Sequence, residues 1–428
     1  MCVFIGLVFW RPQEWLVPWL FGWPILQLIM GIALLTFLAE MKNGRIKMTK
    51  GVIQPYLLFG LWIATIMSHV AHFYFQGMMD TIPDTFKFCF FTAFFFYTLE
   101  RPSRFRTVAI VFVIMSCVMA IHAIMQDRLG YGFVGMGPMF MPATDAKPEY
   151  TRSYFFGTFG DPNDLAQILA TSIPFCFALT KKRSLLGFIM GCAIAWLLIT
   201  AIMATHSRGG LVALATVGAV MFALILPARW MPAVMLFLLG GALVLCPLSA
   251  GYLDESAHDR VVFWGLANWV FKHNWMFGIG YGMFWQVAED RAAHNAYVYC
   301  YTELGVFGYF FWFSLMQLAF MGAWRTRVAL RNPRTDEQAW IKRFSGLGVA
   351  ALAGYSASAY FLSRCYEYPL FFLFAIFGAL PIVAKRRLSG HQTIVGNNFK
   401  DIIACMIGTL LSIVYVYWSI ILLNKAYG

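Results

Sequence analysis

Residues 295–322 read NAYVYCYTELGVFGYFFWFSLMQLAFMG, an apolar run that contains a single charged residue, Glu303. About 20 such residues suffice to cross the hydrocarbon core of a bilayer as a helix. The run follows DRAAH, residues 290–294, so charged and small residues lead to His294 and Asn295 at its start. The stretch predicts a membrane-spanning helix with a histidine just before its N-terminal end.

Similar apolar runs recur along the whole chain. The 428 residues are 60% hydrophobic and 12% charged, whereas soluble proteins carry about 25% charged residues. Apolar spans are expected near residues 1–10, 21–40, 52–70, 84–99, 106–125, 163–180, 184–205, 209–226, 231–250, 295–322, 344–363, 367–384 and 401–423. We therefore predict an all-α fold, a polytopic integral membrane helical bundle with about 12 to 13 spans. The bundle forms one domain over residues 1–428.

The basic residues predict the orientation of the bundle, because Lys and Arg accumulate in cytoplasmic loops. Most of the 32 basic residues lie in alternate loops, which we expect to be cytoplasmic. They are Lys42, Arg45, Lys47, Lys50, Arg101, Arg104, Arg106, Lys181, Lys182, Arg183, Arg229, Arg325, Arg327, Arg331, Arg334, Lys342, Arg343, Lys385, Arg386, Arg387 and Lys400. The net charge of +12 then reflects insertion and contact with anionic lipid, and no nucleic-acid partner is expected.

Two long loops are expected on the opposite, outer side of the membrane, at residues 126–162 and 251–294. The larger one contains HDRVVFWGLANWVFKH, residues 258–273, with apolar side chains at helical spacing. Tryptophans accompany this segment at positions 264, 269, 275 and 285. Tryptophan-rich amphipathic helices are typical of the membrane interface, so we predict an interfacial helix here.

The remaining basic residues are the candidates for binding an anion, because the positive-inside pattern does not explain them. They are Arg11, Lys87, Arg128, Lys147, Arg152, Arg208, Arg260, Lys272, Arg291, Arg364 and Lys425. Snorkelling to the interface or pairing with a neighbouring carboxylate would explain any single one of them equally well.

The first candidate motif is THSRGG, residues 205–210, between two expected spans. Its two glycines would allow a tight turn and a close approach of a ligand to backbone N–H groups. Arg208 would begin the next helix, where the dipole favours anions and a guanidinium offers paired donors to a phosphate. Ser207, Arg208 and Gly209 are therefore candidate ligands, although an ordinary turn with a snorkelling arginine would look the same.

The second candidate is the start of the 295–322 span, at His294 and Asn295. Asn295 is suited to cap a helix that begins at Ala296, which places His294 just outside the bilayer core. Histidine is the side chain whose ordinary pKa lets it accept a proton near neutral pH. The alternative is a helix-end residue without chemistry.

Three further cations complete the candidate set. Arg260 precedes the expected interfacial helix, and GIGYG at 278–282 would return the chain to the site. Arg260 could equally pair with the acidic residues beside it. Arg152 lies upstream of the helix-start signal Asp-Pro-Asn at 161–163, and Lys87 stands at the outer end of a span, where burial is costly.

Metal, cofactor and nucleotide sites are not expected. His69 and His72 are three residues apart, but no HExxH motif accompanies them, and the nine cysteines form no CxxC. No glycine-rich phosphate loop follows a strand, which argues against a cytosolic nucleotide-driven mechanism.

The motifs GTFGDPNDLA, SRGG, an Arg-to-GIGYGMF loop and AHNAYVYCYTELGVFG follow one another in this order over roughly residues 85–320. Together they resemble the bacterial O-antigen ligase and O-antigen polymerase superfamily, and RPQEW at 11–15 is similar to ligase-type members. Trp275 departs from the family pattern, which often has proline before the glycine-rich turn.

The resemblance implies a GT-C-like, metal-independent, inverting glycosyltransferase at the periplasmic face of the inner membrane. The donor would be a glycan on undecaprenyl pyrophosphate, and a ligase would pass it to lipid A–core. The family's arginines and histidine correspond to Arg208, Arg260 and His294, whereas Arg152 and Lys87 are looser matches. The residues favour the same chemistry: we expect these cations, with Ser207, Gly209 and Asn295 beside them, to bind the pyrophosphate, and we expect His294 to take the acceptor proton.

Other functions remain open at this stage. An O-antigen polymerase or a protein O-glycosylation ligase of the same superfamily would share the motifs. A lipid-linked oligosaccharide flippase or transporter would also place cations in a bundle, but it predicts internal repeats, and none is visible in the sequence.

Overall fold

The computed structural model describes residues 2–20, 22–44, 52–143, 148–180, 184–226, 228–230, 255–288, 293–387 and 398–427, together with positions 233 and 236. The expected span at 231–250 lies almost wholly outside the described residues. Residues 251–254 and 289–292 of the predicted 251–294 loop also lie outside the described residues.

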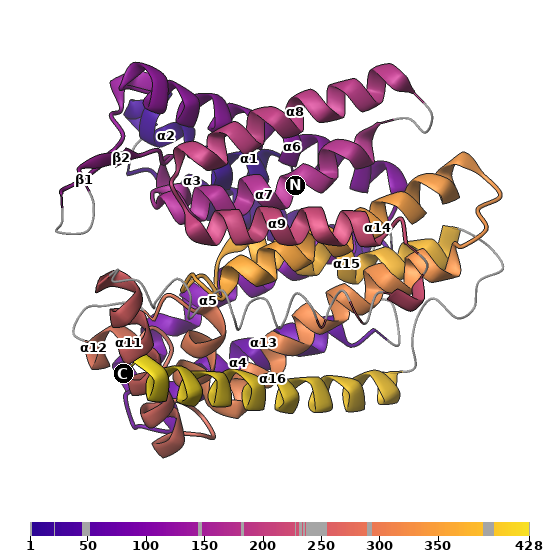
Figure 1. Ribbon diagram of the computed structural model, residues 1–428. Coiled ribbons are helices and arrows are strands. Elements are labelled where there is room, and N and C mark those ends of the chain that lie inside the picture. Colours follow the sequence, from indigo (N-terminus) through magenta and orange to yellow (C-terminus); the bar gives the residue numbers. More distant parts are fainter. Residues whose placement is uncertain are drawn as a thin grey trace.

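The described chain folds into long helices that lie side by side, as Figure 1 shows. They are α1 (Cys2–Trp10), α2 (Pro12–Trp15), α3 (Ile25–Lys42), α4 (Gln54–Val70), α5 (Phe75–Thr98), α6 (Pro102–Leu129), α7 (Pro162–Leu179), α8 (Leu185–Ala204), α9 (Arg208–Ala223), α11 (Glu255–His273), α12 (Phe284–Val287), α13 (Ala296–Ala329), α14 (Asp336–Ala359), α15 (Tyr368–Arg387) and α16 (Asn398–Tyr427). Short 3₁₀ turns occur at Pro18–Leu20, Phe133–Gly135, Gly157–Phe159 and Ala228–Trp230.

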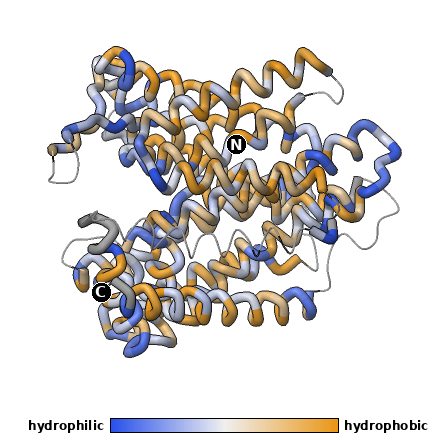
Figure 2. Tube along the Cα trace, viewed as in Figure 1, coloured by the Kyte–Doolittle hydropathy of each residue, from blue (hydrophilic) through white to orange (hydrophobic). Residues whose placement is uncertain are grey.

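The prediction of a polytopic helical membrane protein is confirmed. Among the described residues, six helices are long and apolar enough to cross a membrane: α3, α6, α8, α13, α15 and α16. Hydrophilic segments gather at the two ends of the bundle and hydrophobic residues line the helix bodies between them (Figure 2). Helices also occupy the other expected spans that the structure describes, but the number of 12 to 13 crossings stays a prediction.

Helix α14 packs against α7, α9 and α13 in the middle of the molecule. Its sequence GLGVAALAGYSASA, residues 346–359, is rich in small residues, which let neighbouring backbones approach closely. A Cβ atom at Gly354 would collide with Val217 of α9, and one at Gly348 would collide with Phe377 of α15. The small residues therefore determine how closely the central helices lie.

Helix α13 is broken, whereas the sequence predicted one uninterrupted span. Gly305 has φ 63° and ψ −169°, which a residue with a side chain rarely adopts. The N–H groups of Val306 and Phe307 donate instead to the carbonyls of Trp275 and Met276, at 2.8 and 3.1 Å. The segment before the glycine-rich loop thus inserts into the break and fixes that loop against α13.

Among the described residues, a small antiparallel hairpin departs from the all-helical fold. Strand β1 (Met139–Met141) pairs with β2 (Tyr150–Arg152), and Met139 lies opposite Arg152. The hairpin belongs to the predicted 126–162 loop and lies at the same end of the bundle as α11 and α12 (Figure 1). The connection between α13 and α14 lies at the opposite end (Figure 1). This arrangement agrees with the predicted separation of the loops, and the membrane face to which each end belongs stays a prediction.

Candidate functional site

Three helices begin with side-chain caps near the candidate residues. Asp161 accepts a hydrogen bond from the backbone N–H of Asn163 at the start of α7, at 2.7 Å. Ser207 accepts one from Gly210 at the start of α9, at 3.0 Å. The Asn295 amide oxygen accepts two from the first turn of α13, at 3.1 and 3.2 Å. The predicted caps at Asp161 and Asn295 are confirmed, and all three satisfy N–H groups that the helix itself leaves without acceptors.

A side-chain network joins the hairpin to two of these helix starts. The Asn163 Oδ1 atom accepts hydrogen bonds from Arg152 Nη2 at 2.9 Å and from Ser207 Oγ at 2.7 Å. Arg152 Nε also donates to the carbonyl of Thr205, at 2.9 Å. Asn163 therefore holds Arg152 and Ser207 together, although the sequence suggested only a role in starting the helix.

The THSRGG motif uses its glycines differently from the prediction. His206, with φ 49°, takes the left-handed conformation in the turn, whereas Gly209 and Gly210 lie inside α9. A Cβ atom at Gly210 would overlap Ala166 of α7, and one at Gly209 would lie 3.3 Å from Phe361. The expectation that the glycines make the turn is wrong, because their missing side chains serve close packing of α9.

The two family arginines occupy different environments. Arg208 is the first residue of α9, directly after the Ser207 cap, and its side chain is exposed. Arg260 is half-buried on α11. It lies one turn before Trp264, so the two side chains share a helix face. Arg208 thus lies where the helix dipole favours an anion. Arg260 lies beside Trp264, which contacts the backbone directly before His294.

Trp264 is buried, whereas the sequence placed it with the tryptophans at the membrane interface. Its side chain is 1% exposed, compared with 61% for Trp269. The indole N–H donates to the carbonyl of Ala293, directly before His294. Burial of Trp264 therefore fixes the backbone that leads to the histidine, because a buried indole N–H requires an acceptor.

His294 is half-buried at the start of α13 and has φ 49°. Its backbone N–H donates to Ser363 Oγ, at 2.7 Å. Burial lowers the pKa of the imidazole, Arg260 and Arg364 lower it further, and Asp161 opposes them. The histidine is consequently neutral at neutral pH and has a free electron pair to accept a proton.

Asp161 connects the two halves of the site electrostatically. Burial lowers the pKa of the Arg152 guanidinium, while the Asp161 carboxylate raises it. The same carboxylate raises the pKa of His294. The structure thus brings Arg152, Ser207 and Arg208 together on one side and Arg260 and His294 on the other, with Asp161 acting on both.

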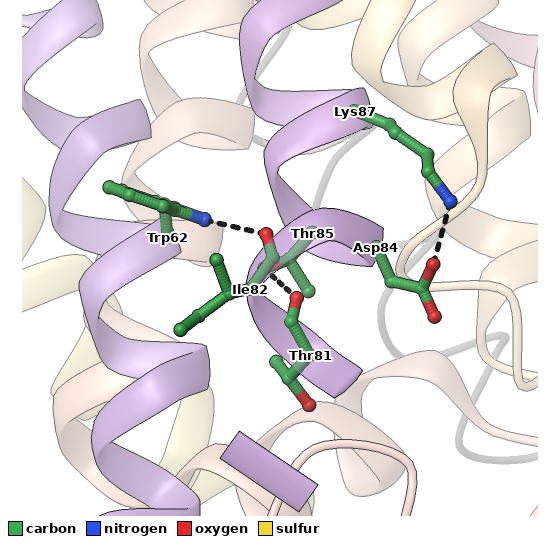
Figure 3. Close-up of polar contacts among 6 residues, drawn as sticks. All are labelled: Trp62, Thr81, Ile82, Asp84, Thr85 and Lys87. Atoms are coloured by element: carbon green, nitrogen blue, oxygen red, sulfur yellow. Dashed lines mark hydrogen bonds and ion pairs between the residues drawn. The ribbon is translucent and has the colours of Figure 1, made fainter. Parts of the chain in front are cut away.

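Lys87 lies within α5, and its ammonium is 2.7 Å from the Asp84 carboxylate one turn earlier (Figure 3). The sequence placed Lys87 at the end of a span, but α5 already begins at Phe75. Asp84 lies inside this helix and is exposed. This ion pair accounts for the charge of Lys87 by itself, and its contact with a pyrophosphate stays a prediction.

The fold and the site define a polytopic helical membrane protein with arginines, capped helix starts and the half-buried His294 at one end of its bundle. Residues 193–313 match the family model described as O-antigen ligase. The match confirms the resemblance to the O-antigen ligase and polymerase superfamily and implies glycosyltransferase-like or ligase activity in general. It includes Arg208, Arg260 and His294, whereas Arg152 and Lys87 lie outside it. A search of the curated proteins found no match.

No group of three or more His, Cys, Asp or Glu side chains placed to hold a metal ion occurs among the described residues. His72 Nε2 instead lies 2.6 Å from the carbonyl of Gly278 in the glycine-rich loop. His69 is buried beside Gly280 of the same loop. The two histidines thus contact the glycine-rich loop that follows the segment inserted into the break of α13.

Proposed function

We propose that the protein is an inverting glycosyltransferase of the O-antigen ligase type. It would move a glycan from undecaprenyl pyrophosphate to a hydroxyl group of lipid A–core at the periplasmic face of the bacterial inner membrane. The observation that carries the proposal is the half-buried His294, whose pKa is lowered by burial and by Arg260, within a region that matches the O-antigen ligase family.

The proposed reaction is a direct displacement at the anomeric carbon. The acceptor oxygen attacks this carbon while the imidazole of His294 takes the proton of the hydroxyl group. The bond between the anomeric carbon and the pyrophosphate oxygen breaks, and undecaprenyl pyrophosphate leaves with the electron pair. One attack from the opposite face inverts the configuration.

The cations of the site would stabilise the negative charge that develops on the leaving pyrophosphate. Arg208 and Arg260 are the principal candidates, and Asn163 holds Arg152 beside Ser207, the residue before Arg208. Ser207, Gly209 and Asn295 would shape the site through the helix starts that they form, and Lys87 is a more distant candidate. No cofactor enters the proposal, so a chelator should leave transfer by purified protein intact.

The test is transfer by purified His294→Ala. We expect its rate to fall at least about a hundredfold, the range for loss of a general base, while donor binding is nearly unchanged. The wild-type rate should fall at acidic pH, and any residual activity of the variant should lack this acid limb. Loss of donor affinity at an unchanged rate would make His294 a phosphate ligand and would contradict its role as the base.

Deletion of the gene separates the alternatives within the superfamily. Loss of glycan from lipid A–core supports a ligase, a product shortened to one repeat supports a polymerase, and loss of glycan from a protein supports a protein O-glycosylation ligase. Accumulation of lipid-linked glycan on the cytoplasmic side would instead indicate a flippase.

A further inference from the structure

The connection between α14 and α15, residues 360–367, contacts candidate site residues although it lies beyond the family match. Its sequence is YFLSRCYE. The segment packs against the start of α9 through Phe361, which lies against Gly209. It is tied to α13 by the indole N–H of Trp312, which donates to the carbonyl of Cys365 at 2.8 Å. The connection is therefore fixed against two of the helices that carry candidate residues.

This connection also holds the backbone of His294. The N–H of His294 donates to Ser363 Oγ at 2.7 Å, and Trp264 holds the preceding carbonyl from the other side. A φ of 49° is unfavourable for a residue with a side chain, so such a conformation persists only where its surroundings impose it. Ser363 and Trp264 are those surroundings.

The residue after Ser363 is anchored by two carboxylates. Arg364 Nη2 lies 2.6 Å from Asp164 Oδ2, and Arg364 Nη1 lies 3.1 Å from Glu367 Oε1. Asp164 is only 5% exposed, and a buried carboxylate is costly without its cation. Burial lowers the pKa of Arg364, but the two carboxylates outweigh it and leave the pKa above its ordinary value. The guanidinium therefore stays charged and in place, and with it the backbone of Ser363.

We propose that Arg364 is a positioning residue, which fixes Ser363 and thereby the conformation in which His294 accepts the proton. This inference rests on the proposed function, because it assigns Arg364 a task in the same transfer reaction. Both guanidinium ends point to carboxylates, so Arg364 acts through His294 and is not assigned as a ligand of the pyrophosphate.

The charges around His294 give the proposal a specific signature. Arg260 faces the histidine from α11, Asp161 from the start of α7 and Arg364 from the connection. Removal of the Arg364 charge should raise the pKa of His294 and move the acid limb of the rate to higher pH. Removal of the Asp161 charge should move the limb to lower pH. Asp161→Asn keeps an oxygen that can cap α7, so the two variants form a matched pair with opposite expected shifts.

The experiment compares purified Arg364→Gln, Arg364→Lys and Asp161→Asn in transfer assays across pH. We expect Arg364→Gln to lower kcat on the order of ten- to a hundredfold, as a misplaced catalytic group does, with a nearly unchanged KM for the donor. Arg364→Lys retains the charge beside Asp164 and should recover part of kcat and keep the wild-type acid limb. Arg104→Gln is the control, because Arg104 also lies beside a carboxylate, that of Glu100, but belongs to a loop predicted to be cytoplasmic.

A double-mutant cycle with His294→Ala separates action through the histidine from independent action. If Arg364 acts through His294, adding Arg364→Gln to His294→Ala should cost no further rate. Additive losses, or a raised KM for the donor with an unshifted acid limb, would overturn the positioning role while leaving the proposed function standing. A wild-type rate without any acid limb would overturn the histidine base and this inference with it. Should Arg364→Gln fail to accumulate, Ser363→Ala against Ser363→Thr tests the same link, and equal kcat in those two would refute it.

Discussion

Replacement of Asn163 by alanine should release Arg152 and Ser207 at the same time. Asn163 Oδ1 accepts from Arg152 Nη2 at 2.9 Å and from Ser207 Oγ at 2.7 Å. A hydrogen bond to a charged group contributes about 1.5 to 3 kcal/mol and a neutral one about 0.5 to 1.5 kcal/mol. Arg152 is half-buried and keeps its bond to the Thr205 carbonyl, so we expect the lower end, about 2 kcal/mol. If Arg152 helps to stabilise the transition state, the share of its own bond, about 1.5 kcal/mol, corresponds to an about tenfold lower rate of transfer.

Two measurements on detergent-purified protein test this expectation. Asn163→Ala should unfold at a lower temperature and transfer glycan more slowly, whereas Asn163→Asp keeps an oxygen for both donors and should remain close to wild type. A cycle that combines Asn163→Ala with Arg152→Gln should give a combined loss smaller than the sum, because the two residues share one contact. Wild-type unfolding temperature and rate in Asn163→Ala would refute the view that Asn163 holds the network together.

Two further predictions concern the family arginines and the topology. Arg208→Lys and Arg260→Lys should each largely abolish transfer while the protein still accumulates in the membrane. Lysine retains the charge but lacks the paired donors of a guanidinium. Full activity in both variants would mean that these arginines only snorkel or pair locally. Single cysteines placed at Ser256 and Thr335 in a cysteine-free background should react oppositely with an impermeant thiol reagent, and reaction of both from outside would contradict the predicted sidedness.

The helical fold was predictable because its signals are local. Apolar runs long enough to cross a bilayer identified the helices, and the Asp161 and Asn295 caps followed from residue type and position. The break of α13 was not predictable in this way. Gly305 adopts its conformation because Trp275 and Met276, far away along the chain, supply the acceptors for the following N–H groups. A glycine within an apolar run does not reveal that another segment inserts beside it.

The sequence proposes the members of the candidate site but not the contacts that hold them. Arg152, Ser207 and His294 were identified from residue type and motif, yet the atoms that hold them come from elsewhere. Asn163 looked like a helix-start residue, and Ser363 carried no signal at all, because a serine beside an apolar span is common. Their roles depend on hydrogen bonds to residues more than 40 positions away, which no local pattern contains.

A positive group that would bind the donor also sets the basicity of the proposed base. Arg260, like Arg364, lowers the pKa of His294, and a pyrophosphate bound at Arg260 would bring negative charge near the histidine. Negative charge near a histidine raises its pKa, so donor binding should make His294 a stronger base when it is needed. The pH dependence of kcat/KM reports groups of the free enzyme, and that of kcat reports groups of the enzyme–substrate complex. We therefore expect the acid limb of kcat, measured at saturating donor, to lie at higher pH than the acid limb of kcat/KM. Coincident limbs in both profiles would show that the pyrophosphate binds too far from His294 to influence it, and the arrangement proposed for the site would then be wrong.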